Sequence, residues 1–466
     1  MKLTIWCLAI LQAGLAQAKS LSLDEYLAEV RKNDPSIQAA ELQQRSSAAL
    51  VESAELPTKI QFFTALNYFD DERPTQNPSA QGLRTVSQGA GVGLKQQTEL
   101  GLQWSLSENI SKTVLLGVSP SFVPAPEYYD AFPKLELNIN LWRNFFGAQT
   151  TADKDSIRKK LTAAQLESEV RVISKIIEAE QTYWQAASTQ ELLRITRENE
   201  ARAEKLYNWS SQRRKKGLAD VSDFFQADAA FKARKLETLS SETRLMELGR
   251  KLNLLRGQVQ EPISEELTYK PIDLSLLKLD GSIEKVRKDI LIQRAGAEAK
   301  AADARANIEK LKPTLDFSAQ MNVVGRDKEL PDAQRKQFEN GNDYYLLGLV
   351  LTIPLDYAMN HRLMTANEQD VEATNLNLKR LELETRNTYQ LTVSQLEQIR
   401  KQLELLRDLE KTQKSKADEE RRRYNLGRST TYQVLTFEQD YVNIISRRLE
   451  LELQARSLLA SLKLFE

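Results

Sequence analysis

The sequence predicts an α+β protein in which one plan, β-strands followed by a long α-helical hairpin, occurs twice. Three observations support this prediction. Two stretches of more than 100 residues lack proline, shorter segments alternate apolar and polar residues, and Pro57-Thr58 matches Pro313-Thr314 at a spacing of 256 residues. Because a proline inside a helix costs about 3 kcal/mol or more, proline-free stretches of this length favour long helices.

Each proline-free stretch turns at a single glycine. Between 148 and 248 the only glycine is Gly217, and from 349 to the end of the chain the only one is Gly427. Glycine ends helices because it adopts the left-handed conformation without strain. The two stretches are therefore predicted to be helical hairpins over 148–256 and 358–466.

A shorter helix is expected upstream of each hairpin. The first arm of each hairpin has 69 residues and the second has 39, so part of the long arm needs another partner. Helical segments at 22–56 and 282–312 have suitable lengths. The match between the halves indicates an internal duplication, with a first repeat over 19–261, a linker or equatorial segment over 262–281 and a second repeat over 282–466.

Strand-like segments lie between the upstream helix and the hairpin of each repeat. Apolar residues alternate with polar ones over about 59–69 and 134–142, and again over about 314–324 and 344–355. This period indicates a sheet with one apolar face, and the lengths match membrane-crossing strands. Four strands cannot close a barrel, so chains would have to combine; a small soluble sheet is the alternative. An insertion at about 89–130 either adds a hairpin to the barrel or folds outside it.

The first 18 residues resemble a cleaved signal peptide. Lys2 is followed by an apolar run and by Ala16-Gln17-Ala18, a typical cleavage site. The apolar run has about 13 residues, too few for the roughly 20 that span a membrane. We expect an exported protein whose only cysteine, Cys7, is removed with the signal, so that the mature chain has no disulfide.

Composition excludes several classes of function. The 65 basic and 65 acidic residues leave no net charge, so no nucleic-acid partner is expected. A mean hydropathy of −0.49 excludes a helical membrane protein. One histidine, His361, and one cysteine leave no material for a metal site or a histidine-based triad. We therefore expect no enzyme activity, no metal and no cofactor.

Segments around both glycines and at both strand-to-helix junctions resemble the TolC-like outer-membrane efflux proteins. Lys216–Asp223 and Tyr424–Thr431 are similar to the hairpin tips of that family, and Asn140–Gly147 and Leu351–Leu355 to its junctions. The resemblance extends over nearly the whole mature chain, because these segments occur in the order and at the spacing of that family. The resemblance implies an α+β membrane protein with internally duplicated long helical hairpins in a periplasmic α-barrel.

The same resemblance implies partners and a location. Four transmembrane β-strands from each chain of a homotrimer would form a barrel in outer-membrane lipid of a Gram-negative bacterium. The protein would be the exit duct of a tripartite efflux or type I secretion system, passively exporting substrates from an inner-membrane transporter and a periplasmic adaptor (membrane fusion) protein. The alternative is a secreted or periplasmic coiled-coil structural or adhesion protein without a channel, which would not explain the strands or the duplication.

The resemblance finally implies a gate at the periplasmic end. Asp223 and Tyr424 occupy positions of a polar network that closes the family's channels; the alternative is that Asp223 lies in the first turn of a helix and only complements its dipole. Ser429 replaces the family's gating arginine, and Gln433 and Thr436 replace its acidic pore ring, so ion selectivity is not implied. The gate candidates are Asp223, Tyr424, Arg428, Ser429, Gln433 and Thr436. The candidates for docking the adaptor are Gly217, Leu218, Ala219, Leu426, Gly427 and Arg428.

Overall fold

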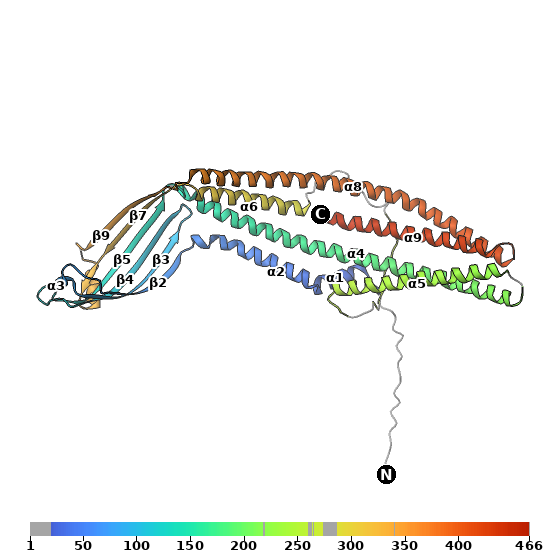
Figure 1. The fold of residues 1–466 in the computed structure, drawn as a ribbon, viewed down its shortest axis with the longest axis horizontal. Helices are drawn as coiled ribbons and strands as arrows, with labels where there is room; N and C mark the ends of the chain where they lie inside the picture. Colours follow the sequence, from blue (N-terminus) through green and yellow to red (C-terminus); the bar gives the residue numbers. More distant parts are fainter. Residues whose placement is uncertain are drawn as a thin grey trace, which may run out of the picture. The chain divides into compact units, whose positions relative to one another are not determined.

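The chain forms two compact units in a computed structural model (Figure 1), and each unit contains segments of both sequence repeats. The helical unit comprises Met1–Gln44, Leu166–Asp289 and Glu382–Glu466, and the sheet unit comprises Arg45–Gln165 and Ile290–Leu381. The structure describes residues 20–217, 220–259, 263, 265–273, 287–339 and 341–465. The expected signal peptide, the tip residues Leu218 and Ala219 and half of the 262–281 linker (262, 264 and 274–281) lie outside these ranges.

Two long hairpins account for most of the helix. Gly217 and Gly427 have φ angles of +70° and +72°, the left-handed conformation in which a helix ends. After Gly427, the Arg428 amide donates to the Arg423 carbonyl at 2.8 Å, which satisfies a carbonyl at the helix end. The hairpin helices are α4 Ala148–Lys215, α5 Val221–Leu255, α8 Tyr357–Asn425 and α9 Thr431–Leu462.

The upstream segments are also helical. In the first repeat the helix breaks at Pro35, where the Asp34 carboxylate accepts the Ser36 amide at 2.6 Å and starts a new helix. These helices are α1 Leu23–Asn33, α2 Pro35–Leu50 and the 3₁₀ segment η1 Val51–Thr58, followed in the second repeat by α6 Lys288–Lys310. None of the described helices has both the length and the apolar character needed to cross a lipid bilayer.

The sheet unit contains an antiparallel sheet in the order β2-β3-β4-β5-β7-β9, with the short β8 paired to β5. Its long strands are β2 Gln61–Asp71, β3 Arg84–Gln97, β4 Leu102–Leu116, β5 Glu127–Asn140, β7 Thr314–Val323 and β9 Asp343–Thr352. The alternating segments of the sequence correspond to β2, β5, β7 and β9.

The number of strands corrects one expectation. Four strands per chain were predicted, and the placement of the insertion was left open. The insertion contributes β3 and β4, which lie between β2 and β5, so six long strands form the sheet. Alternation identifies residues that suit a strand but does not specify their partner, and three glycines in β3, Gly89, Gly91 and Gly93, weaken its apolar–polar pattern.

Short elements complete the fold. A two-residue parallel pair joins β1 to β6 in the helical unit, and α7 packs against β5 and β8 in the sheet unit. The bounds are β1 Ser20–Leu21, α3 Pro78–Gln81, η2 Phe145–Gly147, β6 Glu266–Leu267, β8 Gly325–Asp327, α7 Leu330–Lys336 and η3 Lys463–Phe465.

The helical unit has a well-developed apolar core. One cluster includes the fully buried Tyr26, Tyr183 and Leu252, and the Tyr183 hydroxyl donates to the Leu21 carbonyl at 2.7 Å. Another packs Ile195 of α4 against α9, where Val442, Ile445 and Leu449 lie. The two hairpins are therefore joined by apolar contacts well before their ends.

Candidate functional site

Both return helices begin with a side-chain cap. The Asp220 carboxylate accepts the Ser222 amide at 3.0 Å at the start of α5. At the start of α9 the Thr430 hydroxyl accepts the Gln433 amide at 3.3 Å, and the Gln433 side chain accepts the Thr430 amide at 3.4 Å. Gln433, a gate candidate from the sequence, therefore takes part in a capping box that fixes the second turn.

Tyr424 is buried near the end of α8, with 9% of its surface exposed. Its hydroxyl lies 3.2 Å from the Thr431 hydroxyl, and its ring centroid lies 5.1 Å from that of Trp209 on α4. Burial raises the pKa of the Tyr424 phenol, and the negative charge of Asp223 raises it further. The two gate candidates are thus near enough to interact electrostatically, while the hydrogen bond of the tyrosine goes to Thr431.

The other gate candidates have separate roles in the geometry. The Ser429 hydroxyl donates to the buried carboxylate of Glu420, which also pairs with Arg423 at 3.3 Å. The Thr436 hydroxyl donates to the Tyr432 carbonyl at 2.9 Å, one helical turn earlier. Arg428 is exposed at the turn. Ser429 therefore joins the turn to the end of α8, and Thr436 bonds within its own helix.

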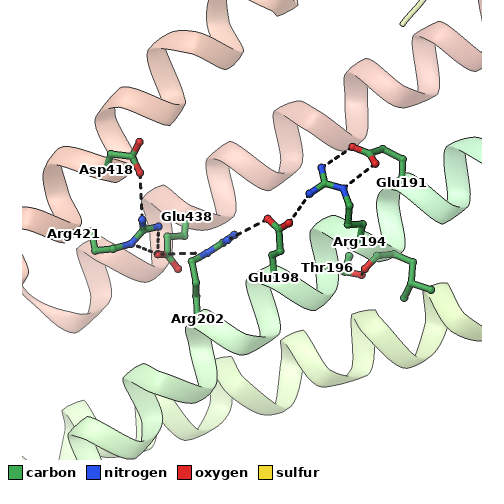
Figure 2. Close-up of polar contacts among 9 residues, drawn as sticks. Glu191, Arg194, Thr196, Glu198, Arg202, Asp418, Arg421 and Glu438 are labelled. Atoms are coloured by element: carbon green, nitrogen blue, oxygen red, sulfur yellow. Dashed lines mark hydrogen bonds and ion pairs between the residues drawn. The ribbon is translucent and has the colours of Figure 1, made fainter. Parts of the chain in front are cut away.

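A chain of charges connects the two hairpins beside these residues (Figure 2). Its centre is Glu438 of α9, a carboxylate whose residue is only 7% exposed. Arg421 of α8 donates to Glu438 at 2.6 and 3.0 Å and also pairs with Asp418 at 3.2 Å. The Arg202 Nε of α4 lies 3.9 Å from the same Glu438 oxygen. One carboxylate therefore contacts helices of both hairpins.

The charges continue to alternate along α4. Arg202 lies 3.8 Å from Glu198, and Arg194 pairs with both Glu198 and Glu191. Local sequence gives no signal for the bridge to α9, because Arg202 and Glu438 are 236 positions apart in the chain. This cross-hairpin contact is the part of the site that sequence analysis missed.

A cavity of about 320 Å³ lies between the hairpins next to this bridge. The residues around it include Arg202, Leu206 and Trp209 of α4, Tyr424 of α8, and Val434 and Glu438 of α9. The Arg202 Nε has no hydrogen-bond acceptor among the described residues. Among the contacts of the described residues, the hairpins are thus linked near their ends by the Trp209–Tyr424 aromatic pair and by a single ion pair, Arg202–Glu438, beside a void.

The sheet presents a second candidate surface. Directly paired residues across the six long strands form one apolar row, Phe62, Leu94, Leu106, Leu135, Met321 and Tyr345. The adjacent row, which points to the opposite face, consists of Gln61, Lys95, Ser105, Glu136 and Gln320 and ends on β9 at Leu346. The sheet therefore has one apolar face along its width, and this row of the opposite face is polar from β2 to β7, while β9 places the apolar Leu346 and Val350 on that face as well.

The apolar face is largely uncovered. Leu347 and Leu349 of β9 are 72% and 64% exposed, and Leu66 of β2 is 83% exposed. Within the described part of the chain, cover is found at its far end, where α7 packs on β5 and the fully buried Ala131 and Ala333 lie. The exposed large apolar members of this face are Phe62, Leu66, Tyr68, Val92, Leu94, Leu106, Leu116, Leu135, Met321, Tyr345, Leu347, Leu349 and Leu351.

Comparison with solved structures identifies the fold. The chain is similar to the outer membrane protein VceC from Vibrio cholerae, with 16% identity, a TM-score of 0.67 and 95% of each chain covered. The Campylobacter jejuni CmeC outer membrane channel aligns at 14% identity and a TM-score of 0.70, over 95% of this chain and 85% of that one. The Neisseria gonorrhoeae MtrE outer membrane channel, solved in its open state, aligns at 14% identity and a TM-score of 0.64, over 95% of this chain and 88% of that one.

Other comparisons are negative. No protein-family model matches the chain, and no curated protein matches it. Among the described residues, no group of three or more histidine, cysteine, aspartate or glutamate side chains is placed to hold a metal ion. The similarity to the three channels confirms the TolC-like α+β fold predicted from the sequence.

Proposed function

We propose that this protein is an outer-membrane channel, the exit duct of a tripartite efflux or type I secretion system. The observation that carries the proposal is the six-stranded sheet with one exposed apolar face and one largely polar face, in a chain with the fold of outer membrane channels. Contiguous exposed apolar surface is unfavourable in water. In a bilayer the same surface faces lipid, and the polar face lines an aqueous lumen.

The proposed assembly is a homotrimer. Open strand edges are not stable in lipid, because their amide and carbonyl groups have no water to bond. Among the described strands, β2 and β9 each have a neighbour on only one side. Copies of the chain would satisfy both edges by pairing head to tail into a closed ring.

The hairpin ends are proposed to receive the periplasmic adaptor and to form the gate. Gly217, Leu426, Gly427 and Arg428 are exposed around the two turns, which suits contact with a partner. The Glu438 bridge would hold the hairpins together in a closed state. Its contact across the hairpins is an ion pair with the Arg202 Nε at 3.9 Å and includes no hydrogen bond, so it is a weak link that adaptor binding can reverse. Transport through such a duct is passive and requires no catalytic residue.

Fractionation tests the location and the assembly together. Three chains of 53.1 kDa, less an 18-residue signal each, give about 155 kDa of protein after extraction in detergent from the outer-membrane fraction. An oligomer of this mass in that fraction is the expected result. A monomer in the soluble periplasmic fraction would instead favour the coiled-coil structural or adhesion protein and would exclude a channel.

A charge-removing variant tests the gate. Glu438→Gln keeps the side-chain shape but removes the charge that pairs with Arg421 and Arg202, so we expect a larger open fraction. The matched control is Asp440→Asn on the same helix, because Asp440 is half-exposed and lies 3.7 Å from Lys416 within its own hairpin. The readouts are single-channel conductance in planar bilayers and uptake of an antibiotic too large for the closed channel. Equal behaviour of the two variants would remove Glu438 from the gate.

A further inference from the structure

We infer that three copies of this chain close an eighteen-stranded barrel, with β3 and β4 forming part of the wall that crosses the membrane. This inference rests on the trimeric channel proposed above and goes beyond it by setting the size of the pore. The resemblance to the TolC-like proteins implied four strands from each chain, twelve in a trimer, and the sequence left open whether the insertion adds a hairpin to the barrel. The structure places six long strands in one sheet, and three sheets of six strands give eighteen.

The first argument is the continuity of the hydrogen-bonded ladder. The register of β2 with β3 runs from Gln61–Lys95 to Asp71–Thr85, and that of β3 with β4 from Arg84–Leu116 to Gln97–Gln103. The β4 register with β5 runs from Leu102–Ile139 to Val114–Glu127. Because β3 and β4 occupy the whole space between β2 and β5, a barrel without them would need these ladders to break.

The second argument is strand length. β3 has 14 residues and β4 has 15, while β2 and β9 have 11 and 10. A strand tilted at about 45° needs roughly 9–11 residues to cross the hydrocarbon core. The inserted hairpin is therefore long enough to span and is longer than the edge strands of the same sheet.

The third argument is the continuity of the apolar face. Val92 and Leu94 of β3 and Leu106 of β4 are 48%, 41% and 50% exposed on the same face as Leu66 of β2 and Leu347 of β9. Ser105, the neighbour of Leu106, points to the polar face and donates to Glu136 at 3.1 Å. In a hairpin exposed to water, apolar side chains that continue the apolar face of the neighbouring strands would be unfavourable.

β3 is also fitted to both of its neighbours on the polar face. A Cβ atom added to Gly89 would lie 2.4 Å from the Asn67 side chain of β2, and one added to Gly91 would lie 2.5 Å from the Asn109 side chain of β4. These two neighbouring side chains therefore lie across the glycines. The β3–β4 hairpin is therefore packed as an internal part of the sheet, between β2 and β5, and does not lie at its edge.

The remaining condition is closure between chains. Six antiparallel strands are an even number, so β2 of one copy runs antiparallel to β9 of the next, as a closed antiparallel barrel requires. Both edge strands are exposed over most of their length. Since barrel diameter grows roughly linearly with strand number, the wall would be roughly half as wide again as a twelve-stranded one, in the range of barrels that enclose an aqueous channel.

Cysteine accessibility in intact cells tests the position of the hairpin. The variants Ser105→Cys and Leu106→Cys are made in a Cys7→Ser background, which has no other cysteine. A membrane-impermeant maleimide should label Ser105→Cys in the lumen at least about tenfold faster than Leu106→Cys, which faces lipid. Equal, rapid labelling of both would place the hairpin in water and overturn the inference.

Disulfide crosslinking tests the closure. Leu66→Cys on β2 is combined in turn with cysteine at Tyr345, Leu347, Leu349 and Leu351, which share its face on β9. One or two adjacent positions should give covalent dimers and trimers, and the control Leu346→Cys, on the opposite face, should not. Absence of crosslinks at all four positions would also overturn the inference. Outer-membrane fractionation of the same variants separates these failures from failure of the channel itself, because a trimer in that fraction keeps the proposed function.

Discussion

The helical unit and the sheet unit handle their large apolar side chains in opposite ways. In the helical unit, Tyr26, Tyr183, Leu252 and Leu396 are fully buried in clusters that join several helices. In the sheet unit, leucine and aromatic residues lie on an exposed face that no other described element covers except at the α7 end. The first unit therefore packs much of its apolar surface inside itself, whereas the second leaves a whole sheet face without a covering element among the described residues.

The largest expected effect comes from a charge on the exposed apolar face. Leu135→Arg on β5 would place a guanidinium among Leu106 and Met321, and such a substitution costs about 2–4 kcal/mol at the bilayer midplane. We expect a strong loss of assembled oligomer from the outer-membrane fraction. Asn138→Arg is the control, because Asn138 lies on the polar face of the same strand and pairs with Ser318. Equal tolerance of both substitutions would contradict the assignment of the two faces.

Replacing a leucine by alanine should destabilise the helical unit strongly when the leucine lies in its core and hardly at all when it lies on the sheet. Leu252 is completely buried in the first cluster, so Leu252→Ala should lower the free energy of unfolding by about 2–5 kcal/mol. Leu347→Ala on β9 removes the same atoms from a side chain that is 72% exposed, and its effect on the helical unit should be close to zero. Thermal unfolding followed by far-ultraviolet circular dichroism of the detergent-purified protein measures both. A larger loss of helix stability for Leu347→Ala than for Leu252→Ala would contradict the assignment of Leu252 to a packed core and of Leu347 to an exposed face.

High pH should weaken the helical unit. Burial raises the pKa of Tyr26, Tyr183, Tyr269, Tyr424 and Tyr441, all of which lie in this unit. A phenol whose pKa is higher in the folded than in the unfolded state gives stability that is complete below about pH 10 and is lost as the pH rises above it. We expect helix loss to accompany phenolate absorbance in an alkaline titration.

Single phenylalanine variants provide the control for this titration. Tyr424→Phe removes one ionisable group and should move the onset of helix loss to slightly higher pH, at the cost of the hydrogen bond to the Thr431 hydroxyl. Ionisation of all tyrosines without loss of helix would contradict the role given to burial.

The sequence predicts the two kinds of region unequally well. Proline and glycine positions locate α8 to within one residue at each end, 357–425 against an expected 358–426, because helix ends are local features. Alternation identifies β2, β5, β7 and β9 for the same reason. The position of β3 and β4 in the sheet depends on which strands they pair with, and the Arg202–Glu438 bridge depends on two helices meeting. Neither is encoded in local periodicity, so neither could be predicted from one sequence.

The smallest expected effect compares two glycines that have equal space around them. A Cβ atom added to Gly427 or to Gly296 would meet no atom within 4 Å. Gly427 ends α8 with a φ of +72°, where an L-residue is strained by roughly 1–2 kcal/mol, so Gly427→Ala should destabilise the second hairpin by about 1 kcal/mol. Gly296 lies inside α6, where alanine is favoured by about 1 kcal/mol, so Gly296→Ala should stabilise that helix.

Thermal unfolding of the two variants beside the parent chain checks the signs. Because the space is the same, steric crowding cannot distinguish the two positions, and only the backbone conformation can. Opposite shifts of the transition would show that Gly427 is required by the turn itself. Stabilisation by alanine at both positions would mean that the second hairpin can turn without a left-handed residue, and the glycine would then have to be explained by contact with a partner.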